Sequence, residues 1–239
     1  SGHKIMFENY YKYGRELNSH DLLKFIAIML MIIDHLGYYF YPNINELRLL
    51  GRLSFPIFFF LIGYNHSTKL STELVAAGLI LVIADWLLGR QLLPLNILFS
   101  VIFCRLLLRY QQEFFSKQLN YTILLLVILH VFLVFIIEYG SIGLMFILCG
   151  LSIRYKFNSL CFFYFTFIFY IIEQSITHGL SWQQQLFIAS SMMILALLLT
   201  KYKLYKFKSS WPFVKFIGRY SLEFYLLHLL LFKLLANWL

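Results

Sequence analysis

The sequence predicts an all-α protein, a polytopic bundle of about nine transmembrane helices. Two properties of the composition support this: 61% of the 239 residues are hydrophobic and only 13% are charged. A soluble domain usually carries about 25% charged residues, and a soluble fold of this size could not hide so much apolar surface from water. Thirdly, the apolar residues form long runs, which lipid accommodates as helices of about 20 residues.

The runs follow one another from residue 22 to the C-terminus, and tyrosines and tryptophans stand near many of their ends, as expected at membrane interfaces. We expect one transmembrane domain at 22–239, preceded by an N-terminal cytoplasmic segment at 1–21 whose first residues read as a tag remnant. In order, the expected helices cover residues 22–41, 49–65, 74–88, 94–110, 120–138, 141–154, 158–174, 183–200 and 214–237.

Lysine and arginine residues set the expected orientation. The segment Lys201–Arg219 carries several of them and no acid, and others follow the fourth and sixth runs, whereas the turns after the fifth and seventh runs carry none. With nine spans, every strongly basic segment falls on one side, which the positive-inside rule places in the cytoplasm. We therefore expect a multi-pass protein of a bacterial inner membrane, with its N-terminus cytoplasmic and its C-terminus outside.

Nucleic acid and metal ions are not expected partners. The net charge of +9 could suggest nucleic acid, but the basic residues lie between apolar runs, where they act as topology signals. Cys104, Cys149 and Cys161 stand inside apolar runs without the spacing of metal ligands. Membrane lipid is the environment that this composition indicates.

Ionisable groups inside an apolar run are costly, so each is a candidate for function. The first run contains Asp34 and His35, and Lys24 precedes His35 with ten residues between them. Eleven helical steps advance about 16.5 Å and return to within about 20° of the same face. Lys24 would then lie at the inner mouth and His35 deep in the membrane. The alternative is a snorkelling lysine and a hydrogen-bonded core histidine.

The remaining polar groups separate by expected depth into a basic inner half and an acidic outer half. A basic inner cavity suits phosphates, and an acidic outer cavity suits a cationic acceptor such as an amine. Two of the acids, Glu138 and Glu173, could instead cap span ends in water. The inner group is Lys24, His66, Lys69, Arg105, Arg109 and Arg154, and the outer group is Asp34, Asp85, Glu138 and Glu173, with Asn96.

Several blocks of this sequence resemble the TraX family, bacterial inner-membrane proteins linked to N-acetylation of conjugative pilin. The most specific are the Asp34-His35 pair and the Gly-Arg-Leu-Ser-Phe-Pro block at 51–56. Further blocks lie at 63–67, at Asp85, and at 96–100, 139–143 and 224–229. The family in turn resembles a wider superfamily of membrane-embedded acyltransferases. In parts of that superfamily a basic residue and a histidine, with ten residues between them, form the active-site signature.

The resemblance implies an acyl-CoA-dependent acyltransferase, most simply an acetyltransferase using acetyl-CoA as co-substrate. His35 is expected to act as a general base on the acceptor amine or as an acetylated nucleophile. Asp34, assigned to the same catalytic pair, is about 100° around the helix and is expected to hold either Arg52 or the acceptor. The expected cofactor-binding residues are Lys24, Arg52, His66, Arg105 and Arg109; Asp85, Asn96 and His228 are expected in the acceptor site or as structural partners.

The acceptor is left open. An amine at the N-terminus of a pilin-like peptide follows from the resemblance, whereas a sugar or lipid O-acetyltransferase would use a hydroxyl, so peptide and glycan acceptors are both candidates. A proton-coupled secondary transporter could also use intramembrane histidines and acids, but the sequence shows no symmetry between two halves. A purely structural membrane subunit is disfavoured by the pairing of Lys24 with His35. His130, in mid-span, is interpreted as structural.

Overall fold

The computed structural model describes residues 17–117, 119–156, 160–208 and 211–238, and it confirms the all-α prediction. A two-stranded antiparallel pair, β1 (Leu17–Asn18) and β2 (Lys206–Phe207), is the sheet of the described chain. The helices are α2 (Ser19–Tyr39), α3 (Asn45–Gly51), α4 (Ser54–Tyr64), α5 (Thr72–Leu87), α6 (Ile97–Lys117), α7 (Leu119–Leu133), α8 (Ile142–Tyr155), α9 (Leu160–His178), α10 (Trp182–Thr200), α11 (Pro212–Arg219) and α12 (Ser221–Trp238).

Several helices can cross a membrane. By length and hydropathy, four candidate spans stand out among the described residues: α2, the stretch Asn45–Tyr64 that includes α3 and α4, α9 and α10. Residues 121–133 of α7 and all of α8 form shorter apolar helices. The chain is therefore a membrane protein, while the count of nine spans and the cytoplasmic N-terminus stay predictions. Most of the expected N-terminal segment, residues 1–16, lies outside the described residues, and α2 begins inside it at residue 19.

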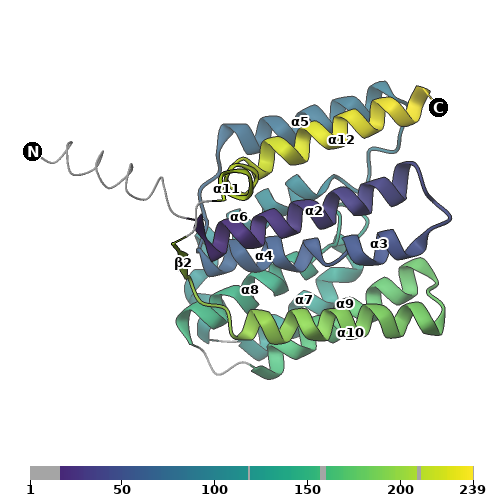
Figure 1. The fold of residues 1–239 in the computed structure, drawn as a ribbon. Coiled ribbons are helices and arrows are strands. Elements are labelled where there is room, and N and C mark those ends of the chain that lie inside the picture. The colour runs from purple at the N-terminus through teal and green to yellow at the C-terminus, as the bar shows by residue number, and fades with distance from the viewer. Residues whose placement is uncertain (1–16, 118, 157–159, 209–210, 239) are drawn as a thin grey trace, which may run out of the picture.

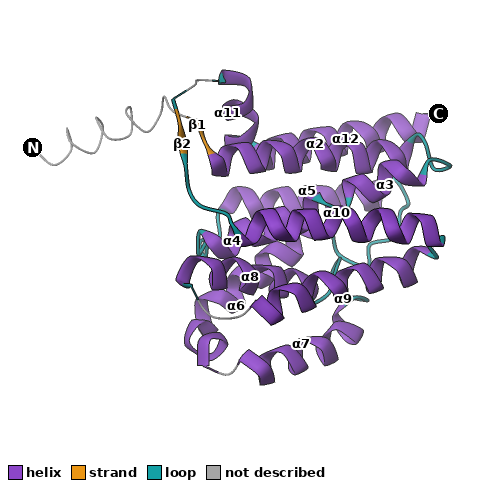
Figure 2. Ribbon diagram, turned by 60° about the horizontal axis from the view of Figure 1, so that its bottom comes forward, coloured by secondary structure: helices purple, strands orange, loops and turns teal. Residues whose placement is uncertain are grey.

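The long helices run roughly parallel in three layers (Figure 1). α5 and α12 lie side by side above α2, which packs beside α3 and α4, and α7 to α10 form the opposite layer. Figure 2 shows α11 crossing the start of α2, next to the β1–β2 pair. The start of α2 and the end of α12 therefore lie at opposite ends of the bundle.

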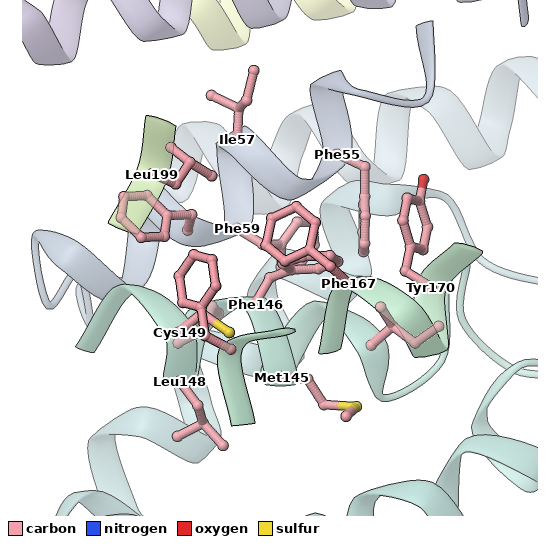
Figure 3. Packing of buried hydrophobic residues seen from close by; sticks show 14 of the residues in the cluster. Phe55, Ile57, Phe59, Met145, Phe146, Leu148, Cys149, Phe167, Tyr170 and Leu199 are labelled. Atoms are coloured by element: carbon pink, nitrogen blue, oxygen red, sulfur yellow. The ribbon is translucent and has the colours of Figure 1, made fainter. Parts of the chain in front are cut away.

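The first of two apolar cores lies between α4 and the layer of α8, α9 and α10 (Figure 3). Aromatic side chains dominate it: Phe55 and Phe59 of α4 meet Phe146 of α8 and Tyr170 of α9. The Phe55 and Tyr170 rings stack with centroids 5.5 Å apart. Such rings bury a large area each, so this core fixes α4 firmly against α8 and α9.

The second core joins α2 to α5 and α12. It contains Ile28 and Met31 of α2, Leu81 of α5 and Leu229 of α12. Another residue of α2, Ala27, belongs to the first core. The helix α2 thus contributes to both cores and holds the two halves of the bundle together.

Glycine residues let α4 and α8 cross closely. A Cβ atom added at Gly63 would lie 1.9 Å from the carbonyl oxygen of Ile147, and one added at Gly150 would lie 2.1 Å from the carbonyl oxygen of Phe60. Small residues at crossings are how membrane helices gain van der Waals contact, since lipid supplies no hydrophobic force between them. Gly63 and Gly150 therefore allow the backbones of α4 and α8 to come into direct contact where the two helices cross.

We expect Gly63→Ala to destabilise the fold by about 1–3 kcal/mol, because the new methyl group must push the backbone of α8 away. Gly78→Ala on α5 is the matched control. There the nearest atom is Cε2 of the Phe99 side chain, 3.2 Å from the added Cβ, and a side chain can move. Thermal unfolding of the purified protein in detergent measures both changes, and equal unfolding temperatures would refute the role of the crossing.

One expected helix, 49–65, is broken between α3 and α4. Pro56, in the first turn of α4, has no N–H to donate to the carbonyl of Arg52, four residues earlier. That carbonyl instead accepts a hydrogen bond from the Tyr170 hydroxyl at 3.1 Å. Arg52 therefore ends α3 with helical dihedral angles, and both its N–H and its carbonyl keep hydrogen-bond partners.

Two other expected spans also differ from the structure. The expected helix 120–138 ends at Leu133, and residues 134–141 form turns with positive φ at Tyr139 and Gly140. Here the backbone of Leu95 bonds to Ile136 and Glu138, which draws the turn against the start of α6. The expected helix 214–237 divides into α11 and α12. In the first case backbone hydrogen bonds to a distant segment accompany the end of a run that hydropathy alone reads as continuous.

Candidate functional site

A cavity of about 1010 Å³ lies at the end of the bundle where α2 finishes and α12 ends. Its walls come from α2, α3, α5, α9 and α12 and from the loops that precede α6 and α8. We call it the large cavity. Its ionisable lining, tyrosines aside, consists of Asp34, His35, Arg48, Arg52, Asp85, Arg90, Glu138, Glu173, His178 and Lys233.

His35 lines this cavity and is paired with His228 behind it. The Nδ1 atom of His35 lies 2.8 Å from Nε2 of His228, and the two rings stack with centroids 5.0 Å apart. Tyr39 and Tyr225 stand on either side, with centroids 6.3 and 6.2 Å from the His35 ring. These contacts fix the orientation of the imidazole at the cavity wall.

Asp34, the neighbour of His35, faces α3 and binds two arginines. Its Oδ1 accepts a hydrogen bond from Nε of Arg48 at 3.1 Å, and Nε of Arg52 lies 3.8 Å away. The expected contact with Arg52 is thus present. Gly51 makes it possible, since a Cβ there would lie 2.2 Å from Cβ of Asp34. The Gly-Arg pair of the 51–56 block therefore brings α3 onto α2 at Asp34.

Arg52 connects this cluster to the opposite wall. Its guanidinium donates to the hydroxyl of Tyr139, and one of its nitrogens lies 3.2 Å from Nε2 of His178. Its carbonyl holds Tyr170. Arg52 thus links α3, the α7–α8 loop and α9, and it lies in the large cavity rather than beside Lys24, with which the sequence had grouped it.

The expected acceptor-site residues differ in their surroundings. Asp85 of α5 forms an ion pair with Lys233 of α12, and both line the large cavity. Asn96 uses both ends of its side chain inside the protein: it donates to the Gly78 carbonyl at 3.1 Å and accepts from the Leu98 amide at 3.2 Å. Asn96 therefore joins α5 to the start of α6, and it also lines the large cavity.

The sequence predicted an acidic cavity in this half of the protein, but the large cavity carries both signs of charge. Among the described lining residues, four carry carboxylates and four are lysine or arginine. The prediction was wrong because Lys233, Arg48 and Arg90 were given no role at the site and because Arg52 was grouped with the inner basic residues. Glu138 and Glu173 line the cavity and are only partly exposed, so neither is a simple water-facing cap.

Lys24 lies elsewhere, at what we call the basic end, where α2 begins. It is within electrostatic reach of Asp21, Arg105 and Glu223, and it is not among the described residues that line the large cavity. Arg105 of α6 donates to the carbonyl of Lys69 at 2.8 Å, while its Nε is buried without a partner among the described residues. The expected pairing of Lys24 with Arg105 is therefore consistent with the fold.

His66 also belongs to the basic end. It follows α4 with a positive φ of 51°, and its Nδ1 lies 3.5 Å from the hydroxyl of Tyr155. Its Nε2 is buried without a hydrogen bond to the described residues. Arg154 donates to the carbonyl of Tyr64 at 2.7 Å, and Arg109 is exposed on α6. The structure thus collects the expected basic residues around the loop between α4 and α5, apart from Arg52.

Sequence reasoning gave no role to several residues of the large cavity, Lys233, Arg48 and Tyr139 among them. Lys233 lies near the end of the last expected helix and Arg48 just before the second, and neither was considered for the site. Tyr139 stood inside a quoted block but was given no role, although its ring stacks on Phe55 at 3.9 Å. The sequence did contain a signal for the missing cations. Asp34 and Asp85 are carboxylates inside apolar runs, and each requires a positively charged partner there.

Comparison with known proteins identifies the family of the chain. The TraX protein family model matches residues 19–236. A protein of Rickettsia prowazekii (strain Madrid E), described as uncharacterized, is 43% identical over 84 residues, which are 35% of this chain and 34% of that protein. The match thus spans about a third of the length of that curated relative, and no solved structure matches the chain. Because the family model covers nearly the whole chain and every residue of the large cavity, the protein belongs to the TraX family.

Proposed function

We propose that this protein is an integral membrane acetyltransferase that moves an acetyl group from acetyl-CoA to an amine acceptor. The TraX family is associated with pilin acetylation, which makes the N-terminus of a pilin-like peptide the first acceptor to test. The observation that carries the proposal is His35, an oriented imidazole on the wall of a cavity of about 1010 Å³. Histidine is the side chain most often used for proton transfer near neutral pH.

The basic end is the proposed site for the phosphates of acetyl-CoA. Lys24 and Arg105 supply charge there, and the buried Nε of Arg105 and Nε2 of His66 lack protein partners among the described residues. Arginine and lysine bind phosphates through charge-assisted hydrogen bonds. Lys24 and His35 are eleven residues apart on α2, about 16.5 Å along the helix, which an extended pantetheine arm can bridge.

The large cavity is the proposed acceptor site, with His35 between it and the thioester. The acceptor amine, in its neutral form, attacks the thioester carbonyl and forms the C–N bond. His35 takes the proton that the nitrogen loses, the C–S bond breaks, and the proton passes to the departing thiolate to give free CoA. In the alternative sequence His35 itself attacks the thioester and then transfers the acetyl group to the amine. Both sequences end in an amide and CoA.

Acetyl transfer by the purified protein tests the proposal. The protein in lipid nanodiscs is given isotopically labelled acetyl-CoA with a peptide carrying a free N-terminus, with the same peptide already blocked, and with a glycan. Labelling of the free peptide alone is expected. Labelling of the glycan alone would make the protein an O-acetyltransferase. A failure to bind acetyl-CoA at all would exclude an acetyl-CoA enzyme and leave the proton-coupled transporter as the remaining candidate.

Lys24→Ala should weaken acetyl-CoA binding at least tenfold, because a hydrogen bond to a charged group contributes about 1.5–3 kcal/mol. Lys203→Ala is the matched control, because it also removes a positive charge from the end of the bundle where α2 begins. The carbonyl of Lys203 accepts a hydrogen bond from Ser19 at the start of α2, but its side chain is exposed. Isothermal titration of both variants gives the dissociation constants. If Lys24→Ala binds as tightly as the wild type, the phosphate site has been misplaced.

A further inference from the structure

A chain of hydrogen bonds runs from the backbone carbonyl of Phe224 through His228 to His35, which lines the large cavity. The carbonyl oxygen of Phe224 lies 2.6 Å from Nδ1 of His228. The Nε2 of His228 lies 2.8 Å from Nδ1 of His35. The Nε2 of His35 has no hydrogen bond from any described residue, and His35 lines the cavity.

The first bond determines where the protons of this chain sit. A carbonyl oxygen only accepts, so Nδ1 of His228 must carry a proton. A neutral His228 then has a lone pair on Nε2, and a buried imidazole between membrane helices is stabilised in its neutral form. The lone pair accepts the proton of His35 Nδ1, which leaves Nε2 of His35 unprotonated.

We infer that His228 is a positioning residue, which holds the ring proton of His35 on Nδ1 so that Nε2 faces the cavity as a base. The assignment of the tautomer rests on the hydrogen bonds alone, and its catalytic consequence rests on the proposed function. When Nε2 takes a proton, the bond from Nδ1 to His228 becomes charge-assisted and strengthens. His228 thereby stabilises the protonated form of His35 without touching the acceptor.

The position of His228 fits this role better than a place in the acceptor site. Tyr225 and Leu229 of α12 line the large cavity, but His228 is not among the described lining residues and is only 9% exposed. It stands behind His35, packed against Phe232 with ring centroids 5.6 Å apart. The ion pair of Lys233 with Asp85 anchors α12 to α5 further along the same helix.

Nitrogen-15 spectra of the histidine rings test the inference without any activity. In ¹⁵N-histidine-labelled protein, with His35→Ala used to assign the signals, we expect Nδ1 of His35 to be protonated and Nε2 to be bare. His228→Leu removes the acceptor, so the proton should shift towards Nε2, which free histidine prefers. His228→Gln keeps an acceptor and a donor in similar positions and should preserve the wild-type pattern. A proton on Nε2 of His35 in the wild type overturns the inference, even if neither His228 variant folds.

The kinetic arm separates this inference from the proposed function. With acetyl transfer established, His228→Leu should lower kcat by about 10²-fold or more with little change in the KM for the acceptor, since losing the group that fixes a tautomer can cost as much as 10⁴. His228→Gln should recover most of the rate. Correct ring protonation in a protein that transfers no acetyl group would support the inference and reject the proposed function. Equal rates for Leu and Gln variants would reject the positioning role.

Discussion

His35→Ala is expected to abolish acetyl transfer while leaving acetyl-CoA binding intact. Removing a general base costs about 10²–10⁴ in rate, and removing a nucleophile costs more. Binding should survive because the proposed phosphate site lies around Lys24 and Arg105, about 16.5 Å away along α2. Turnover with labelled acetyl-CoA and binding by titration, measured on the same preparation, give the two quantities separately.

His130→Ala is the matched control for this variant. His130 is also a buried histidine in a helix, 8% exposed, but it packs against Phe169 and is not among the described residues that line the large cavity. It should keep its turnover once folding is verified. Near-normal turnover in His35→Ala would show that the proposed mechanism is wrong. Loss of acetyl-CoA binding in a folded His35→Ala protein would instead make His35 a binding residue.

Asp34→Ala is expected to destabilise the protein by about 3–5 kcal/mol, the usual cost of leaving a buried charge without its partner. The carboxylate of Asp34 is the acid that contacts both Arg48 and Arg52, and the side chain of Arg52 is only 12% exposed. Without it, Arg48 and Arg52 both lose the carboxylate that they contact. Thermal unfolding in detergent should show a large fall in the unfolding temperature.

The control for Asp34→Ala is Glu46→Ala, which removes an exposed acid from the first turn of α3. It should leave the unfolding temperature nearly unchanged, since exposed charges contribute little. Arg48→Ala should fall between the two, because Arg52 can still pair with Asp34. A stable Asp34→Ala protein that has lost only turnover would mean that Asp34 acts on the acceptor directly.

Much of the bundle follows from hydropathy, because an apolar run that must satisfy its backbone in lipid has little choice but a helix. What hydropathy cannot register is a single missing N–H. The run 49–65 is mostly apolar, yet its helix is interrupted between Gly51 and Ser54, and the Tyr170 hydroxyl that binds the carbonyl left free by Pro56 comes from 118 residues away. The same limit applies at Tyr139, where the turn depends on pairing with the loop before α6.

Some residues of the candidate site could be predicted singly from the sequence, but the assembly could not. His35, His228 and Asp85 stood out because each is polar within an apolar run. Their partners did not follow, since His35 and His228 are 193 residues apart and Asp85 and Lys233 are 148 residues apart. Which helices become neighbours depends on small contacts such as that of Gly51 with Asp34, which a sequence pattern does not specify.

The two separate cores have a mechanical consequence for the large cavity. Arg52, Tyr139 and Glu173 belong to the wall built on the first core, whereas Asp85 and Lys233 belong to the wall built on the second. The helix α2 contributes to both cores, so it connects the two walls of the cavity. A molecule bound between the two walls contacts both at once, so its binding stabilises the folded arrangement of both cores together.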